Sequence, residues 1–203
     1  MSEKKRPYKM RKRAQSQEET RQRIIEATMK LHEEIGPRAT TISAIAEEAG
    51  VQRLTVYRHF PDETAVFQAC TSHWLELNPP PDPRDWDDVP DPKARLRQVL
   101  GAFYDYYART RRMWTASFRD VDAVPALQAP MAEVAAFLGT VAKDLTKALD
   151  PDGTNGMTGP TVRHVLHFST WQELGAQGLS EPEKLDLALA WASGAEQQGD
   201  LQP

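Results

Sequence analysis

Cysteine is nearly absent from this sequence of 203 residues, and the single Cys70 cannot form an internal disulfide. One free thiol neither requires nor excludes an oxidising compartment. The sequence also lacks a run of about 20 apolar residues, the length needed to span a membrane. Its charged N-terminus has no apolar stretch of the kind found in signal peptides. We therefore expect a cytoplasmic chain that does not associate with membranes.

Enzyme motifs are missing as well. The sequence contains five histidines and 29 acidic residues, but no nucleophile motif, glycine-rich phosphate loop or zinc-ligand spacing. His164 and His167 lie three apart on one helical face, yet no nearby cysteine or defined carboxylate accompanies them. We expect no enzyme activity, no metal site and no cofactor. Strand-like alternation and hairpin signals are also lacking, which favours an all-α fold.

Charge is distributed unevenly along the chain. Residues 1–76 carry 13 Lys and Arg against 11 Asp and Glu, whereas residues 77–203 carry 12 against 18. The N-terminal arm (residues 1–15) contains seven basic residues against Glu3 alone: Lys4, Lys5, Arg6, Lys9, Arg11, Lys12 and Arg13. Because phosphate neutralisation is the main sequence-independent term in nucleic-acid binding, the arm suggests a polyanionic partner. By itself it is equally compatible with a disordered solubilising tail or a nuclear-localisation-like run.

A first helix is predicted from Gln17 to Ile35. Ser16 and Glu19 have the spacing of a capping box, and Gly36 followed by Pro37 is typical of a helix end. Apolar or small residues recur along one face at helical spacing: Ile24, Ala27, Thr28, Leu31 and Ile35.

The next two predicted helices have the pattern of a helix-turn-helix. The first begins after Thr40 or Thr41, either of which can cap it, and Ala46 is small enough for the crossing helix to approach closely. Gly50 tolerates the positive φ of the turn, and helical periodicity restarts at Gln52. Four apolar residues form the predicted seam: Ile45, Ala49, Val51 and Val56. An ordinary helical hairpin shares the alanine and glycine spacing but not the accompanying seam and basic arm.

A fourth helix follows Pro61 and Asp62, with four residues facing inward: Val66, Phe67, Cys70 and Trp74. The stretch 78–92 is rich in proline and aspartate, so we take it as the junction between domains. Residues 16–77 then form the N-terminal domain and residues 78–203 the C-terminal one. Later helices are predicted over Pro92–Arg109, Arg111–Val121, Pro125–Leu149, Gly159–Gly175 and Glu181–Ala195, with a flexible loop over 150–156.

The exposed face of the third helix is the predicted DNA-reading surface. Gln52 and Arg53 lie at its N-terminal end, where a recognition helix meets base edges in the major groove. Four further residues suit phosphate oxygens: Thr55, Tyr57, Arg58 and His59. Tyr57 also fits a partly buried core position with only its hydroxyl exposed.

Residues from about Thr20 to Trp74 resemble the DNA-binding domain of the TetR family of bacterial regulators. The resemblance is carried by Arg23-Ile24-Ile25-Glu26-Ala27, Gly36, Thr40-Thr41-Ile42, Ile45-Ala46, Ala49-Gly50-Val51 and Thr55-Val56-Tyr57-Arg58-His59-Phe60-Pro61. It implies a homodimer, a divergent C-terminal ligand domain and repression relieved by a small molecule. It further implies phosphate contacts through Thr41, Tyr57 and His59.

Two positions depart from the family pattern. Glu63, next to Asp62, stands where a phosphate-contacting lysine is common, and Leu54 stands where a small residue is usual. Acids there suit the helix dipole but repel nearby DNA. Our hypothesis is that the basic arm, including Arg11 and Arg13, supplies the phosphate affinity that Glu63 does not.

The C-terminal half is dense in aromatic residues, most of which fit a packed core. A subset with one histidine also suits an apolar ligand pocket, with walls for a planar or cationic molecule: Phe103, Tyr107, Trp114, Phe118, His167 and Trp171. The last two helices carry apolar stripes compatible either with a core or with two-fold pairing into a four-helix bundle. The resemblance favours a homodimer through these helices, which makes palindromic DNA the natural target.

The sequence thus predicts an all-α protein with an N-terminal three-helix helix-turn-helix DNA-binding domain and a C-terminal helical ligand-binding and dimerisation domain. The predicted function is a transcriptional regulator, a repressor released from operator DNA by a small-molecule effector. Activation in place of repression fits the same residues. The alternative is a protein-binding or architectural module with a weakened DNA-binding domain, to which Glu63 lends some support.

Overall fold

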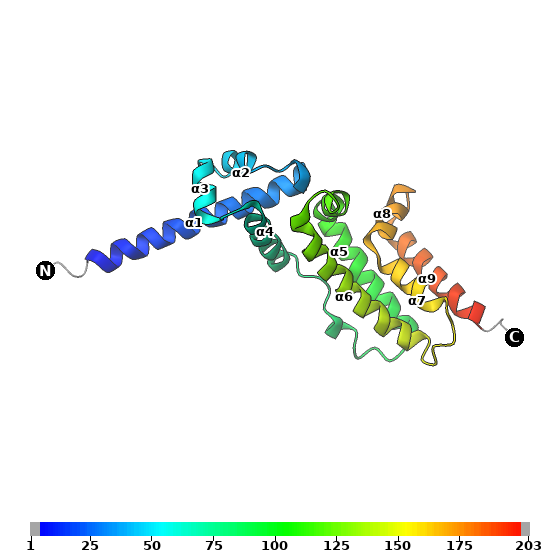
Figure 1. The fold of residues 1–203 in the computed structure, drawn as a ribbon. Helices are drawn as coiled ribbons and strands as arrows, with labels where there is room; N and C mark the ends of the chain where they lie inside the picture. The colour runs from blue at the N-terminus through cyan, green and yellow to red at the C-terminus, as the bar shows by residue number, and fades with distance from the viewer. Residues whose placement is uncertain (1–4, 200–203) are drawn as a thin grey trace. The chain divides into compact units, whose positions relative to one another are not determined.

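The computed structural model describes residues 5–199, with side chains described for residues 10–195. Within these residues all regular structure is helical, which confirms the predicted all-α fold class (Figure 1). The α-helices are α1 (Lys5–Glu34), α2 (Ile42–Glu48), α3 (Arg53–His59), α4 (Glu63–Leu77), α5 (Pro92–Asp120), α6 (Pro125–Leu149), α7 (Thr158–Leu166), α8 (Phe168–Ala176) and α9 (Glu181–Gly199). Two short 3-10 helices, η1 (Pro37–Ala39) and η2 (Pro83–Asp85), join them.

The helices group into two compact units. The first unit comprises α1 to α4 and residues 115–130, and the second comprises residues 79–114 and the chain from residue 131 onward. The sequence-based boundaries assigned residues 115–130 to the C-terminal domain. The structure groups them with the N-terminal helices, and Arg119 and Asp120 bind the backbone just after α1.

Helix α1 starts twelve residues earlier than the sequence predicted, so the predicted start at Gln17 is wrong. Ser16 lies inside the helix, where its carbonyl accepts a hydrogen bond from the Thr20 hydroxyl at 2.8 Å. The cause is composition: residues 8–19 contain neither glycine nor proline and are mostly good helix formers. The described part of the basic arm is therefore helical, and its first four residues lie outside the described range. The predicted stop at Gly36 is confirmed, although Ile35 is exposed.

The core of the first unit forms where α1 packs against α2, α3 and α4 (Figure 1). Its buried residues include the predicted seam members Ile45, Ala49 and Val56, with Val51 packed against them. The four predicted inward residues of α4 are all buried, which confirms that prediction: Val66, Phe67, Cys70 and Trp74. This core holds α2 and α3 against one long helix.

Helix α5 is continuous, whereas the sequence predicted two helices with a break near Thr110. Between Gly101 and Asp120 there is no glycine or proline, and the Thr110 hydroxyl donates to the Tyr106 carbonyl one turn earlier. A threonine that bonds back into its own helix does not interrupt it. The predicted helix over Pro125–Leu149 is confirmed as α6.

The opposite correction applies to α7 and α8, which were predicted as a single helix. His167 adopts extended backbone angles, φ −77° and ψ 138°, and its ring nitrogen caps α8 by accepting from the Ser169 amide. An extended residue ends one helix and starts another, and it leaves carbonyls of the preceding turn without intrahelical donors.

Two tyrosines of α5 supply the donors that this break removes. The Tyr104 hydroxyl donates to the Val165 carbonyl at 2.9 Å, and the Tyr107 hydroxyl donates to the Leu166 carbonyl at 2.8 Å. Both side chains are almost fully buried. Buried carbonyls without partners are costly, so these bonds stabilise the break and attach α5 to it.

No single helix among the described residues is long and apolar enough to cross a membrane. By length and composition alone, α5 and α6 reach that threshold as a pair bent by 117°. Tyr106 of α5 and Leu145 of α6 are each only 1% exposed, as in the core helices of a folded domain.

Candidate functional site

The turn between α2 and α3 has the geometry that the sequence predicted. Gly50 has φ +65°, a region that side-chain-bearing residues rarely adopt, and the Val51 amide donates to the Ala46 carbonyl at 2.9 Å. Ala46 is 4% exposed, so its small side chain lies at the helix crossing. These local constraints fix the orientation of α3 relative to α2.

Thr41, and not Thr40, caps α2. Its hydroxyl oxygen accepts from the Ala44 amide at 3.2 Å, whereas the buried Thr40 hydroxyl donates to the Gly36 carbonyl at 2.9 Å. Thr41 itself is exposed. Its hydroxyl hydrogen is therefore available to an oxygen acceptor outside the protein while its oxygen caps the helix.

The outer face of α3 is polar and exposed. Gln52 and Arg53 are both exposed, and the Arg53 guanidinium lies 6.0 Å from the centre of the Tyr57 ring, which is 41% exposed. Arg58 is exposed and its Nη2 donates to the Thr55 hydroxyl at 3.4 Å. All the predicted residues of this helix therefore lie on α3 or, for Gln52, at its N-cap. Among them Thr55 and His59 are half-buried.

The opposite side of α3 is anchored in the core. Val56 is fully buried, and Phe60 at the end of the helix lies beneath the Arg21 guanidinium, 5.0 Å from its ring centre. Arg23 donates to the Ala49 carbonyl at 3.2 Å, at the end of α2. Sequence analysis missed these two roles of α1, because nothing local in the sequence shows which residues α1 meets across the fold.

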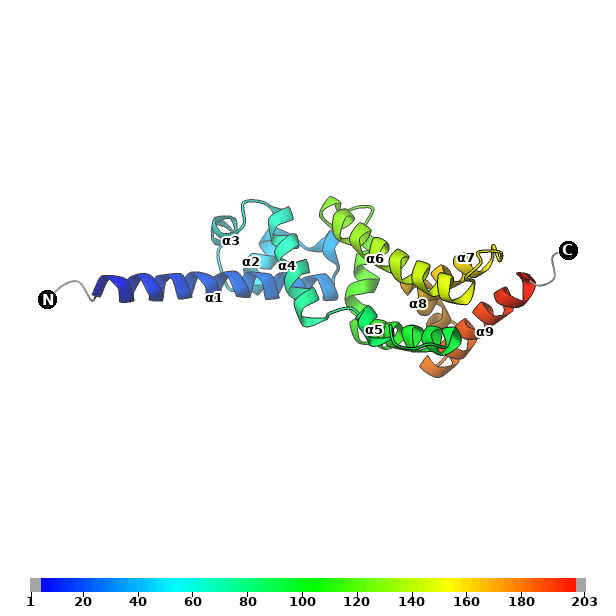
Figure 2. The same cartoon turned by 90° about the horizontal axis from the view of Figure 1, so that it is seen from below.

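Arg11 and Arg13 lie farther toward the start of α1, and both are exposed. Every described side chain from Met10 to Glu19 is exposed, and Figures 1 and 2 both show the first half of α1 running out past α2, α3 and α4. The described part of the arm is therefore a projecting helix, and it presents Arg11, Lys12 and Arg13 to solvent.

The acidic pair before α4 has a structural role. Asp62 caps the helix, since its Oδ1 accepts from the Ala65 amide at 2.8 Å, and Glu63 lies exposed in the first turn. Negative charge at a helix N-terminus is stabilising. Glu63 thus adds negative charge at the start of α4, and this charge would repel a phosphate placed nearby.

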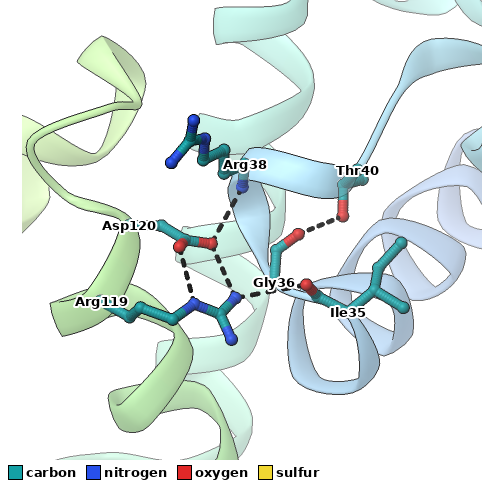
Figure 3. Close-up of polar contacts among 6 residues, drawn as sticks. All are labelled: Ile35, Gly36, Arg38, Thr40, Arg119 and Asp120. Carbon is teal, nitrogen blue, oxygen red and sulfur yellow. Dashed lines mark hydrogen bonds and ion pairs between the residues drawn. The ribbon is translucent and has the colours of Figure 1, made fainter.

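A polar cluster attaches residues 115–130 to the end of α1 (Figure 3). Asp120 accepts from the Arg38 amide at 3.1 Å and from Arg119 Nε at 2.8 Å, and Arg119 Nη2 also donates to the Ile35 carbonyl at 3.2 Å. The hydrogen bonds from Arg119 lower the pKa of Asp120. Gly36, at φ +91°, lies against this pair, and a β-carbon there would collide with the guanidinium. The cluster fixes the loop that precedes α2.

His32 and Cys70 are the buried titratable pair of the first unit, with His32 Nδ1 3.7 Å from Cys70 Sγ. Burial lowers the pKa of His32 to about 4 and raises that of Cys70 to about 12. Both groups are therefore neutral at pH 7, and the thiol has little thiolate character. The pair belongs to the core and does not form an activated nucleophile.

The predicted ligand-pocket residues divide between the two units. Phe118 belongs to the first unit, and five residues belong to the second: Phe103, Tyr107, Trp114, His167 and Trp171. Ring centres of Phe103 and Trp171 each lie 6.0 Å from that of Tyr107, and both side chains are buried. The Tyr107 hydroxyl is engaged by the Leu166 carbonyl, so this cluster offers mainly apolar ring surface.

A buried lysine, Lys184, contacts the Trp171 ring of this aromatic cluster. Lys184 Nζ lies 4.2 Å from the centre of the Trp171 ring and 2.7 Å from Glu181 Oε1. The same carboxylate accepts from Trp171 Nε1 at 2.8 Å. These contacts hold α8 against the first turn of α9.

Comparison with known proteins agrees with the helix-turn-helix geometry. Residues 24–70 match the family model described as bacterial regulatory proteins, tetR family. The HTH-type transcriptional regulator SrpR of Pseudomonas putida is 42% identical over 85 residues, which are 39% of this chain and 40% of SrpR. The uncharacterized HTH-type transcriptional regulator TtgW, also of Pseudomonas putida, is 41% identical over 85 residues, 39% of this chain and 63% of TtgW. The matches thus span less than two thirds of either relative.

Solved structures with the same fold extend over most of the chain. A TetR-like transcriptional regulator from Rhodococcus sp. RHA1 has a TM-score of 0.59 at 16% identity, covering 85% of this chain and 93% of its own. A TetR transcription regulator from Haloarcula marismortui ATCC 43049 has a TM-score of 0.59 at 19% identity, covering 88% and 97%. At these identities the likeness concerns the fold alone.

Proposed function

Because residues 24–70 match the family model of bacterial regulatory proteins, tetR family, we propose that this chain is a DNA-binding transcriptional regulator of that family. In this proposal α3 enters the major groove of operator DNA, and the chain acts as a cytoplasmic repressor released by a small molecule. The observation that carries it is the outer face of α3. Gln52, Arg53 and Arg58 are exposed there, no acid interrupts the helix, and buried Val56 anchors its other side.

Arg53 is the first residue to test. An arginine paired with a guanine contributes about 1–3 kcal/mol of discrimination, so Arg53→Ala should weaken binding about 5- to 150-fold. A gel-shift assay on the DNA upstream of the chain's own gene measures this. Arg163→Ala, at an exposed arginine of α7, is the matched control and should bind like the wild type. Equal affinity of the two variants would contradict the role given to α3.

Phosphate contacts are assigned to Thr41, Tyr57 and His59, with further charge supplied by Arg11 and Arg13 from the projecting part of α1. Lys12 lies between the two arginines, and all three side chains are exposed. If each of the three neutralises one phosphate, changing all three to glutamine reduces the slope of log affinity against log salt by about 2.7. Glutamine is a good helix former, so these substitutions should leave α1 helical. An unchanged slope would show that the projecting part of α1 does not contact DNA. Deleting residues 1–13 should have the same direction of effect.

A homodimer through α8 and α9 would present two copies of α3 to a palindromic operator. Support comes from Trp191 of α9, which is 38% exposed although it is a large aromatic residue, and whose ring centre lies 6.0 Å from that of His164. Trp191→Glu should shift the chain toward monomer in sedimentation experiments and weaken binding to a two-half-site operator. A dimer of unchanged stability would place the interface elsewhere.

The effector site is proposed at the aromatic cluster around Tyr107, where apolar rings suit a planar ligand. Anilinonaphthalene sulfonate is a suitable fluorescent probe of such a site. Its binding should weaken in Trp171→Ala, whereas Trp74→Ala, at a buried tryptophan of the first unit, serves as the control. Equal loss in both variants would contradict the placement of the effector site at this cluster, and increased binding in either variant would indicate a loosened fold.

A further inference from the structure

Leu54 lies on the exposed face of α3, and its side chain is 69% exposed. Successive residues of an α-helix turn by about 100°, so Leu54 and Arg58 both point about 160° away from the fully buried Val56. Leu54 makes no contribution to the core from this position. Fold stability therefore does not explain why a leucine occupies this exposed position of the helix.

The surroundings of Leu54 are polar and basic. Arg53 leans toward the Tyr57 ring, and Arg58 bonds to the Thr55 hydroxyl, so both arginines are held beside the leucine by their own helix neighbours. No acidic residue lies on α3. A protein partner that docks on an apolar surface needs a wider patch than one leucine among cations. A polyanion that presents a single small apolar group matches this surface better.

Duplex DNA presents such a group. On the floor of the major groove, thymine carries a C5 methyl, whereas cytosine carries only a hydrogen at C5 and the two purines present their N7 acceptor. Resting on the proposal that α3 enters the major groove, we propose that Leu54 is a specificity-determining residue that selects thymine through this methyl. Arg53 and Arg58 flank the contact and pair with guanine or phosphate, while Leu54 excludes water from the methyl.

The expected effect is modest and position-specific. Burial of one methyl-sized apolar group corresponds to about fourfold in affinity. Uracil differs from thymine only by that methyl, so replacing the contacted thymine with uracil should weaken binding about fourfold. Uracil at any other position of the half-site should change the affinity less.

The experiment uses the full chain and a binding site selected from random duplexes. Each thymine of the selected site is replaced in turn by uracil, and dissociation constants are measured at one salt concentration for the wild type and Leu54→Ala. The affinity of the wild type should fall about fourfold when one particular thymine of each half-site is replaced by uracil. The affinity of Leu54→Ala should not change on that replacement. Leu77→Ala, at a leucine of α4 that is 58% exposed, is the matched control and should keep the wild-type uracil penalty.

Three outcomes overturn the inference. A wild type indifferent to every uracil, or a Leu54→Ala variant with the same penalty as the wild type, removes the methyl contact while leaving DNA binding intact. A Leu54→Ala variant with unchanged DNA binding but altered sedimentation assigns Leu54 to contact with a second copy of the chain. If no duplex is enriched at all, the proposed function itself fails, which is a distinct result.

Discussion

His32 provides a test of how the first unit responds to acid. Its side chain is 3% exposed, and its ring meets the Phe67 ring edge-on, with centres 4.5 Å apart. Among the described residues its Nε2 has no hydrogen-bond partner. Burial lowers the pKa of His32 to about 4, although the charge of Asp120 acts in the opposite direction. The folded unit therefore disfavours the imidazolium.

The sign and size of the effect follow from linkage. In the unfolded chain the pKa of His32 returns to about 6.5, so between pH 6.5 and pH 4 the unfolded state binds more protons than the folded state. The free energy of unfolding then falls as the pH falls through this range. With a folded pKa of about 4, the loss attributable to His32 is near zero at pH 8 and about 2 kcal/mol at pH 5.

Urea unfolding followed by far-UV circular dichroism measures this loss at both pH values. His32→Leu keeps a side chain of similar volume and removes the titrating ring, so the gap in stability between variant and wild type should widen by about 2 kcal/mol in favour of the variant at pH 5. Comparing the two proteins cancels the contributions of other groups. If the variant loses as much stability as the wild type, or if NMR titration places the His32 pKa near its ordinary value, the account of its burial is wrong.

Three further substitutions test single contacts by the same unfolding assay. Tyr107→Phe removes the donor to the Leu166 carbonyl without creating a large cavity and should cost about 1–3 kcal/mol, whereas Tyr57→Phe, at an exposed tyrosine, should change stability by less than about 0.5 kcal/mol. Asp120→Asn should destabilise the chain at pH 7, and because its folded pKa is lowered, it should also remove the part of the stability that the wild type loses as the pH falls below about 4. Asp62→Ala removes the cap of α4 and should cost about 1 kcal/mol; no change would show that the Ala65 amide finds another acceptor.

The features that the sequence predicted correctly are those with local causes. Gly36 and Gly50 end helices because they adopt positive φ, and both positions were identified from residue type and spacing. The buried seam around Val56 followed from helical periodicity. The helix-turn-helix and its exposed face were therefore predictable before any coordinates.

The features that sequence analysis missed depend on contacts between distant residues. The break at His167 is stabilised by hydroxyls of Tyr104 and Tyr107, about 60 positions earlier in the chain. Asp120 joins the first unit because it binds the Arg38 amide, 82 positions away. No local pattern distinguishes a tyrosine whose hydroxyl donates to a distant carbonyl from one that lines a pocket. The aromatic residues of α5 therefore predicted only a core or a ligand site.

The same distinction separates Tyr107 from Leu54 as binding residues. Tyr107 combines an aromatic ring with a hydroxyl, which made it a strong pocket candidate, but its hydroxyl is already bound to the backbone. Leu54 has no polar side-chain atom and departs from a family pattern, and the fold leaves its side chain 69% exposed. A large side chain that the protein exposes at a cost, and does not use internally, is better explained by a partner than one whose contacts are complete. By that criterion a partner is needed to explain the exposed face of α3, whereas contacts within the second unit already account for Tyr107.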